Sequence, residues 1–244
     1  MSRFVQLLAV FAAFLSCNSA EIPSYLTTCS RSDPNFQKCC LESGRRAIPQ
    51  LAKGDKRLKL RVLEPLAIPE IRIDTSGNLK LTLTDVILYG LGNMQLRKMN
   101  FDLEKQTISL DMHNDNIQVI GDYTIDGRIL ILPITGNGKI NVTMVNGAIG
   151  YSFQYDIIQK NGVEYIKALE PDVTLVSERT YYKLDNLFNG DKRLGEEMNK
   201  FLNENHKEMS KELNPSITET ISAIATEIVE NVLNVIPYHE LVRP

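Results

Sequence analysis

The histidines and glycines of this sequence do not form a recognisable catalytic pattern. His113, His206 and His239 fall in three unrelated predicted elements. The sequence has no Gly-x-Ser-x-Gly turn, which presents the nucleophile in many hydrolases. Gly136 and Gly138 lack the third glycine of a phosphate-binding loop. We therefore expect no enzymatic activity and no cofactor.

One predicted strand brings carboxylates and an imidazole onto the same face. Asp111, His113 and Asp115 alternate with Met112 and Asn114, and alternate residues of a strand share a face. No glycine follows them where a calcium-binding loop needs one. The pattern predicts the outward, solvated face of a strand, and no metal site is expected.

The first 20 residues have the pattern of a secretory signal peptide. Arg3 supplies the positive charge, residues 4–15 are apolar, and residues 17–20 are mostly small. The apolar run is shorter than the roughly 20 residues that a membrane span needs. The formal net charge of −3 argues against nucleic-acid binding. We expect a secreted, soluble, monomeric protein with one domain over residues 21–244.

Three cysteines, Cys29, Cys39 and Cys40, follow this segment. Export makes a disulfide the favoured state. Cys29 can pair with only one of its two adjacent partners, so one thiol stays free, and the residues alone leave the choice open.

The last fifty residues or so carry the clearest helical pattern. Apolar residues recur every three or four positions and so share one helix face. They are Leu213, Ile217, Ile221, Ile224, Ile228, Val232 and Val235. Asp191 is a candidate cap for an upstream continuation, and Pro237 follows the end. Pro215 predicts either a kink or a break with Asn214 as a new cap.

Residues 71–177 alternate apolar and polar side chains, which is typical of strands. Turn-forming residues divide this region at 76–77, 114–116, 126–127, 136–138, 146–147 and 161–162. The pattern predicts an antiparallel meander of roughly seven or eight strands with one apolar face. A short helix over Pro34–Leu51 and an extended linker over Glu64–Pro69 precede it.

The apolar face of the sheet and the apolar stripe of the helix must bury each other. The sheet has more apolar residues on its predicted inner face than one helix can cover. The predicted helix at residues 34–51 is short and does not fill the difference. An internal ligand cavity and a fully packed core are the two alternatives that remain.

Several stretches of the chain resemble the takeout and juvenile hormone-binding protein family of insects. They are Cys29–Cys39 with the following Ala47–Gly54, then Asp185–Asn205, and Leu213-Asn-Pro with the ending Ile236–Leu241. The resemblance therefore covers nearly all of the chain after the signal peptide.

This resemblance implies an α+β fold, in which a strongly curved antiparallel β-sheet wraps a long C-terminal α-helix and encloses an apolar tunnel. It implies a Cys29–Cys39 disulfide with Cys40 as the extra thiol. It also implies carriage of a small hydrophobic ligand, such as a juvenile hormone-like terpenoid, a fatty acid or a similar lipid. His206 stands where the family commonly has tryptophan, and the chain after the signal peptide lacks a fourth cysteine. Both departures favour the takeout-like branch, which is associated with feeding, chemosensory and circadian physiology.

The candidate ligand-binding residues are the apolar members of the two facing patterns. They are Leu81, Leu83, Met99, Phe101, Leu110, Met112, Val119, Val142, Met144, Phe153 and Tyr155 of the sheet and Ile217, Ile221, Ile224 and Ile228 of the helix. Asn141 begins a glycosylation sequon, Asn-Val-Thr, and should face outward if its neighbours face inward.

A second hypothesis is a secreted regulator that acts through contacts with a protein receptor. Its basis is the basic run Lys53, Lys56, Arg57, Lys59 and Arg61. Such a run is most often a solvated face, and the alternative is a docking patch for an acidic surface.

Overall fold

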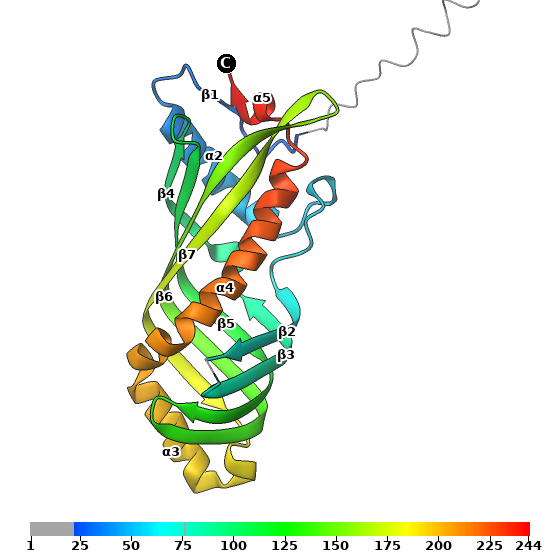
Figure 1. Cartoon of the computed structure of the whole chain (residues 1–244). Coiled ribbons are helices and arrows are strands. Elements are labelled where there is room, and N and C mark those ends of the chain that lie inside the picture. Colours follow the sequence, from blue (N-terminus) through cyan, green and yellow to red (C-terminus); the bar gives the residue numbers. More distant parts are fainter. Residues whose placement is uncertain (1–21, 76) are drawn as a thin grey trace, which may run out of the picture.

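A computed structural model describes residues 22–75 and 77–244, so the predicted signal peptide lies outside the described residues. An antiparallel sheet of six strands has the order β2-β3-β5-β6-β7, and β4 pairs with the first half of β5. The strands are β2 (Leu66–Asp74), β3 (Leu79–Tyr89), β4 (Gln95–Asp102), β5 (Thr107–Ile129), β6 (Leu132–Lys160) and β7 (Val163–Leu184). The sheet curves around one long helix, α4 (His206–Leu233), in Figure 1. The predicted α+β class with this arrangement is confirmed.

Strands β2 and β7, at the two ends of the main strand order, both contact α4. No pairing between β2 and β7 occurs within the described chain, so the sheet is not closed into a barrel. A twisted sheet curls around a rod in this way because its strands rotate progressively. The helix thus lies between the edges and covers the concave face of the sheet (Figure 1).

Three strands are much longer than the sequence indicated. Strands β5, β6 and β7 have 23, 29 and 22 residues. Gly77, of the turn predicted at 76–77, and residues 161–162 do lie between strands, whereas the turns predicted at 114–116, 126–127, 136–138 and 146–147 lie inside β5 or β6. The predicted count of seven or eight strands is therefore wrong. The actual β5–β6 reversal is at Leu130 and Ile131, residues without a turn signature.

The false turns at 114–116 and 146–147 mark a real irregularity. Asp115, Asn146 and Glu178 lie opposite one another on the three long strands. Asn146 has a φ of 50°, which interrupts the alternation of side chains along β6, and its amide donates to Glu178 at 2.6 Å. We call these three residues the switch row.

The inward face changes parity at the switch row. Before it, Ile108 and Met112 of β5 belong to clusters that pack against α4. Beyond it, odd-numbered residues such as Ile117 and Val119 face inward instead. Strands β5 and β6 keep one register throughout, so the row changes the facing of side chains without shifting the pairing.

The C-terminal helical region is two helices, α3 (Lys192–Glu204) and α4. The predicted cap is confirmed, because the Asp191 carboxylate accepts the Leu194 backbone N–H at 3.0 Å. The interruption between the helices falls at Asn205, whose amide donates to the Phe201 carbonyl at 2.8 Å.

The predicted alternative of a break at Asn214 is wrong, since α4 continues through Pro215. The Asn214 side chain does not cap the helix. It donates instead to the Leu175 carbonyl of β7 at 3.1 Å, and so ties α4 to the sheet edge.

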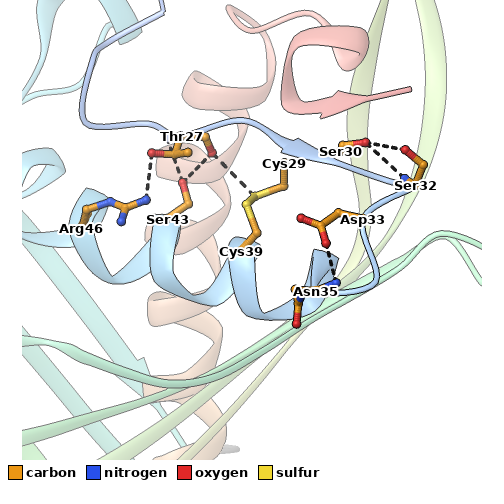
Figure 2. The surroundings of a disulfide bond; sticks show 9 residues. All are labelled: Thr27, Cys29, Ser30, Ser32, Asp33, Asn35, Cys39, Ser43 and Arg46. Carbon is orange, nitrogen blue, oxygen red and sulfur yellow. Dashed lines mark hydrogen bonds between the residues drawn. A yellow bond between two sulfur atoms is a disulfide. The ribbon is translucent and has the colours of Figure 1, made fainter.

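A disulfide between Cys29 and Cys39 joins β1 (Cys29–Ser30) to α2 (Phe36–Leu51), as Figure 2 shows. The pairing that the family resemblance implied is confirmed, and Cys40 is a buried free thiol. Beside the disulfide, the Ser43 hydroxyl donates to the Thr27 carbonyl at 2.7 Å and accepts its N–H at 3.0 Å. Strand β1 pairs in parallel with β8 (Val242–Arg243), which follows α5 (Tyr238–Leu241), so both ends of the described chain meet here.

Residues 53–63 pack beside the C-terminal half of α4, and we call them the strap. Leu58 and Leu60 of the strap are buried against Ile236, together with Ile228 and Val232 of α4. The segment predicted as an extended linker, Glu64–Pro69, is extended from Leu66 onward, but there it is the first part of strand β2. Among the described residues, no helix is long and apolar enough to cross a membrane.

Candidate ligand-binding site

The concave face of the sheet is filled by protein side chains at the α3 end. Leu81 and Leu83 are buried there in one cluster with Tyr123 of β5 and with Met198 and Leu202 of α3. This end is ordinary core in which the two predicted site residues pack against other side chains.

The α2 end of the same face is also filled. Phe101, Phe153 and Tyr155 are buried in a second cluster that includes Phe36 of α2. The Phe101 ring lies 5.8 Å from that of Phe36 and 5.6 Å from that of Tyr155, the latter edge-on. The first pair is tilted and the second is edge-on, and edge-on aromatic pairs are favourable in protein cores. Met99 is half-buried at the border of this cluster.

Between these ends the apolar face is only half-buried, although α4 covers it. The remaining nine predicted residues are all half-buried, and we call them the middle belt. They are Leu110, Met112, Val119, Val142, Met144, Ile217, Ile221, Ile224 and Ile228. Val119, Val142 and Ile217 border the α3-end cluster, Leu110 and Met112 border the α2-end cluster, and Ile228 borders the cluster around Ile236. Apolar side chains this deep in a fold are normally covered by their neighbours. Here the protein's own side chains leave apolar surface uncovered.

The wall of the middle belt contains residues that the sequence analysis missed. Ile117, Ile149 and Leu175 form a buried cluster with half-buried Met112, Met144, Ile217 and Ile221 around it. Met94 packs against the same cluster and adds a third methionine. The parity change at the switch row concealed these residues, because false turns at 114–116 and 146–147 placed them next to chain reversals. An unbroken apolar alternation from Ile149 to Tyr155 was the available signal.

Two tyrosines place hydroxyl groups where β6 and β7 meet α4. Tyr151 is buried, and its hydroxyl is 3.0 Å from the Thr226 hydroxyl of α4. Burial raises the pKa of Tyr182 and of Tyr151 above the usual tyrosine value, so both hydroxyls stay neutral. The Tyr151 hydroxyl is already engaged within the protein through Thr226.

The residues with potential for other chemistry lie apart from the middle belt. His113 is 3.0 Å from Asp115 on the convex face of β5, as the strand pattern indicated. His206 is buried at the start of α4, where burial and the nearby Arg179 lower its pKa. His239 lies beside Glu240 on α5. Within residues 22–75 and 77–244, no group of His, Cys, Asp and Glu could hold a metal ion.

A groove of about 670 Å³ lies between β7 and the polar flank of α4. Its α4 residues include Glu219, Ser222 and Ala223, which point away from the stripe that contains Ile217 and Ile221. The groove is therefore separate from the middle belt.

Comparison with known proteins places this architecture among insect proteins. The family model of haemolymph juvenile hormone binding protein matches residues 6–243. The crystal structure of Takeout 1 from Epiphyas postvittana superimposes with a TM-score of 0.81 and 29% identity, over 89% of this chain and 99% of that one.

Two curated relatives extend the comparison. The circadian clock-controlled protein daywake of Drosophila melanogaster is 26% identical over 243 residues, which cover 93% of this chain and 92% of the relative. A putative beta-carotene-binding protein of Schistocerca gregaria is 29% identical over 124 residues, which cover 50% of this chain and 49% of the relative.

Proposed function

The chain belongs to the haemolymph juvenile hormone binding protein family, and on this premise we propose that it is a secreted carrier that binds a small lipophilic ligand. The observation that carries the proposal is the middle belt, where apolar surface between α4 and the sheet lacks full cover. A ligand held there would lie along Ile217, Ile221 and Ile224 on one side, with β5 and β6 on the other.

Binding in the middle belt would be driven by apolar burial, on the order of 25 cal/mol per Å² of surface removed from water. Met94, Met112 and Met144 suit such a wall, because a thioether chain is flexible and polarizable and adapts to different shapes. The Tyr151 hydroxyl already has a partner in the protein, the Thr226 hydroxyl. We therefore infer few polar contacts and a ligand such as a juvenile hormone-like terpenoid, a fatty acid or a similar lipid.

The name of one relative supports a proposal about the physiological role of this chain. Daywake is named as a circadian clock-controlled protein, and we extend that circadian link to this chain. A monomer suffices for the carrier function, because α4 and the sheet of one chain surround the middle belt.

Mass spectrometry of lipids that co-purify with the protein, followed by calorimetric titration of the delipidated protein against a lipid panel, tests the carrier function. We expect saturable binding with one ligand per chain and no chemical change in the ligand. A delipidated, folded protein that binds no member of the panel would contradict the proposal.

A regulator that acts mainly by protein contacts is the second candidate. The observation in its favour is the strap, whose basic side chains are exposed. The two candidates differ in the titration, since a regulator of this kind would bind its receptor equally well with and without lipid.

A further inference from the structure

The strap contains a tight loop that projects cations into solvent. Asp55 and Leu60 exchange backbone hydrogen bonds of 3.1 and 2.9 Å, which close the base of the loop. Between them, Leu58 is fully buried while Lys56, Arg57 and Lys59 are exposed. The loop is thus anchored by one apolar side chain and displays its charges outward.

The base of this loop is also fixed by side chains. The Tyr25 hydroxyl donates to Asp55 at 2.7 Å, and Arg57 forms an ion pair with the same carboxylate at 2.6 Å. Arg61 reaches Glu227 of α4 at 3.4 Å. Two carboxylates therefore face a group of five cations, and the group keeps an excess of positive charge.

Lys59 occupies a backbone conformation that lysine does not favour. Its φ is 55°, in the left-handed region where glycine and asparagine are preferred. Glycine would adopt this positive φ with the least backbone strain. Lys59 is one of ten described non-glycine residues with a positive φ, so this conformation makes glycine a compatible replacement there and does not by itself explain the lysine.

The strap covers the same helix stripe that continues into the middle belt. Ile228 and Val232 of α4 pack under Leu58 and Leu60, and Ile228 is also a candidate ligand-binding residue. Val62, beside these cations, is a large apolar side chain that is 53% exposed. A surface that meets the strap would therefore lie next to one end of the proposed ligand site.

We propose that the strap is a docking surface for an anionic lipid membrane, at which the protein loads or releases its ligand. This proposal rests on the carrier function argued above. A charged bilayer attracts several cations at once without needing a complementary shape, and Val62 suits its interfacial region. An acidic protein would need to match the particular positions of these side chains, and a carrier of lipid must in any case meet a lipid phase.

Flotation of the purified protein with vesicles tests the docking surface directly. We expect binding to phosphatidylcholine vesicles that contain phosphatidylserine, none to pure phosphatidylcholine, and a loss of binding as salt is raised. Absence of binding to the anionic vesicles at low salt overturns the proposal.

The variant Lys59→Gly tests the contribution of the Lys59 charge to membrane binding without disturbing the fold. Glycine suits the backbone at this position, so the variant should fold at least as well as the wild type, yet bind anionic vesicles about fivefold more weakly. Adding Lys56→Gln should increase the loss to roughly 25-fold, since each cation near the surface contributes about equally. Lys80→Gln and Lys98→Gln, exposed on the convex face of the sheet, are matched controls that should leave binding unchanged. Equal losses in the controls would show a general charge effect and overturn the assignment.

Transfer of a fluorophore-tagged fatty acid from preloaded protein to anionic vesicles distinguishes this proposal from the carrier function. We expect Lys59→Gly to slow transfer while leaving the Kd for the tagged fatty acid unchanged. If the wild type fails to take up any lipid, the carrier function fails. If it takes up the probe but transfers it at the same rate with and without the strap cations, only the docking surface fails.

Discussion

Asn203 of α3 satisfies both backbone hydrogen-bonding groups of Tyr182 on β7. Its carboxamide oxygen accepts the Tyr182 N–H at 2.9 Å, and its NH₂ donates to the Tyr182 carbonyl at 2.7 Å. Asn199, one turn earlier, makes the same pair of bonds with Leu184 at 2.9 and 2.8 Å. Two side chains thus take the place of a neighbouring strand along an edge that would otherwise be unpaired.

Replacement of Asn203 by Ala should destabilise the protein by about 1–3 kcal/mol, because it leaves the Tyr182 N–H and carbonyl without partners. Asn203→Asp retains the acceptor but loses the donor, and it should also be destabilising. Urea denaturation measures both effects as a lower transition midpoint. Glu204→Ala, at an exposed neighbouring position, is the control. Equal stability of Asn203→Ala and the control would show that water replaces the side chain without cost.

The Cys29–Cys39 disulfide should contribute roughly 2–5 kcal/mol to the free energy of unfolding, so Cys29→Ser should lower stability by that amount.

The free thiol of Cys40 should react slowly in the folded protein. Burial raises the pKa of the Cys40 thiol to about 11, so the reactive thiolate is scarce at neutral pH. We expect iodoacetamide to modify Cys40 only after unfolding, as peptide mapping without reduction would show. Rapid modification of the native protein, or a Cys29–Cys40 peptide, would contradict this prediction.

Val142→Phe tests the middle belt. Val142 is half-buried opposite α4, so the added bulk should occupy ligand space, weaken lipid binding and leave the melting temperature nearly unchanged. Phe101→Trp is the matched comparison in the packed α2 end, where overpacking should cost about 1–3 kcal/mol with little effect on binding. The site is misplaced if Val142→Phe destabilises the fold and leaves the Kd for lipid unaltered.

Asp55 should make stability depend on pH in acid. The hydrogen bond from Arg57 holds the pKa of the Asp55 carboxyl well below its usual 3.8. A carboxyl with a depressed folded-state pKa stabilises the protein above its unfolded pKa, and this contribution is lost as the pH falls through the folded pKa. The difference in unfolding free energy between wild type and Asp55→Asn should therefore be constant above about pH 5 and shrink below pH 4. A difference that is independent of pH would show that Asp55 acts by packing alone.

Asn141 should carry a glycan in the secreted protein. Ile140 and Val142 on either side face the core or the middle belt, so Asn141 faces the convex surface. Endoglycosidase treatment should reduce the mass of the wild type and leave Asn141→Gln unchanged. No change in the wild type would mean that the sequon, which lies within β6, is not modified.

The parts of this fold that could be predicted from sequence are those where one pattern decides the outcome. The stripe on α4 and the Asp191 cap follow from helix geometry, and the alternation in residues 71–177 indicates a sheet with one apolar face. Strand length could not be predicted in this way. Asn146-Gly147 has the composition of a hairpin turn, and only the pairing of β6 with both neighbours shows that the chain continues straight on.

The candidate site shows the same division. Periodicity identified which residues face inward, including Val142 and Ile221. It could not show how completely neighbouring side chains bury each of them. Phe101 and Val142 have equivalent places in the sequence pattern. They differ because Phe36 of α2 packs on Phe101, a contact between residues far apart in the chain.

The switch row also constrains how this protein can change in evolution. Strands β5 and β6 keep one register across Asp115 and Asn146, yet the residues that face inward are even-numbered on one side of the row in β5 and odd-numbered on the other. Removing a single residue beside the row would turn half of a strand inside out and expose its apolar face to water. Lengthening the molecule would require matched insertions of two residues in adjacent strands. We therefore expect related proteins to vary freely in side-chain identity at the middle belt while keeping the spacing between the switch row and each end of the sheet.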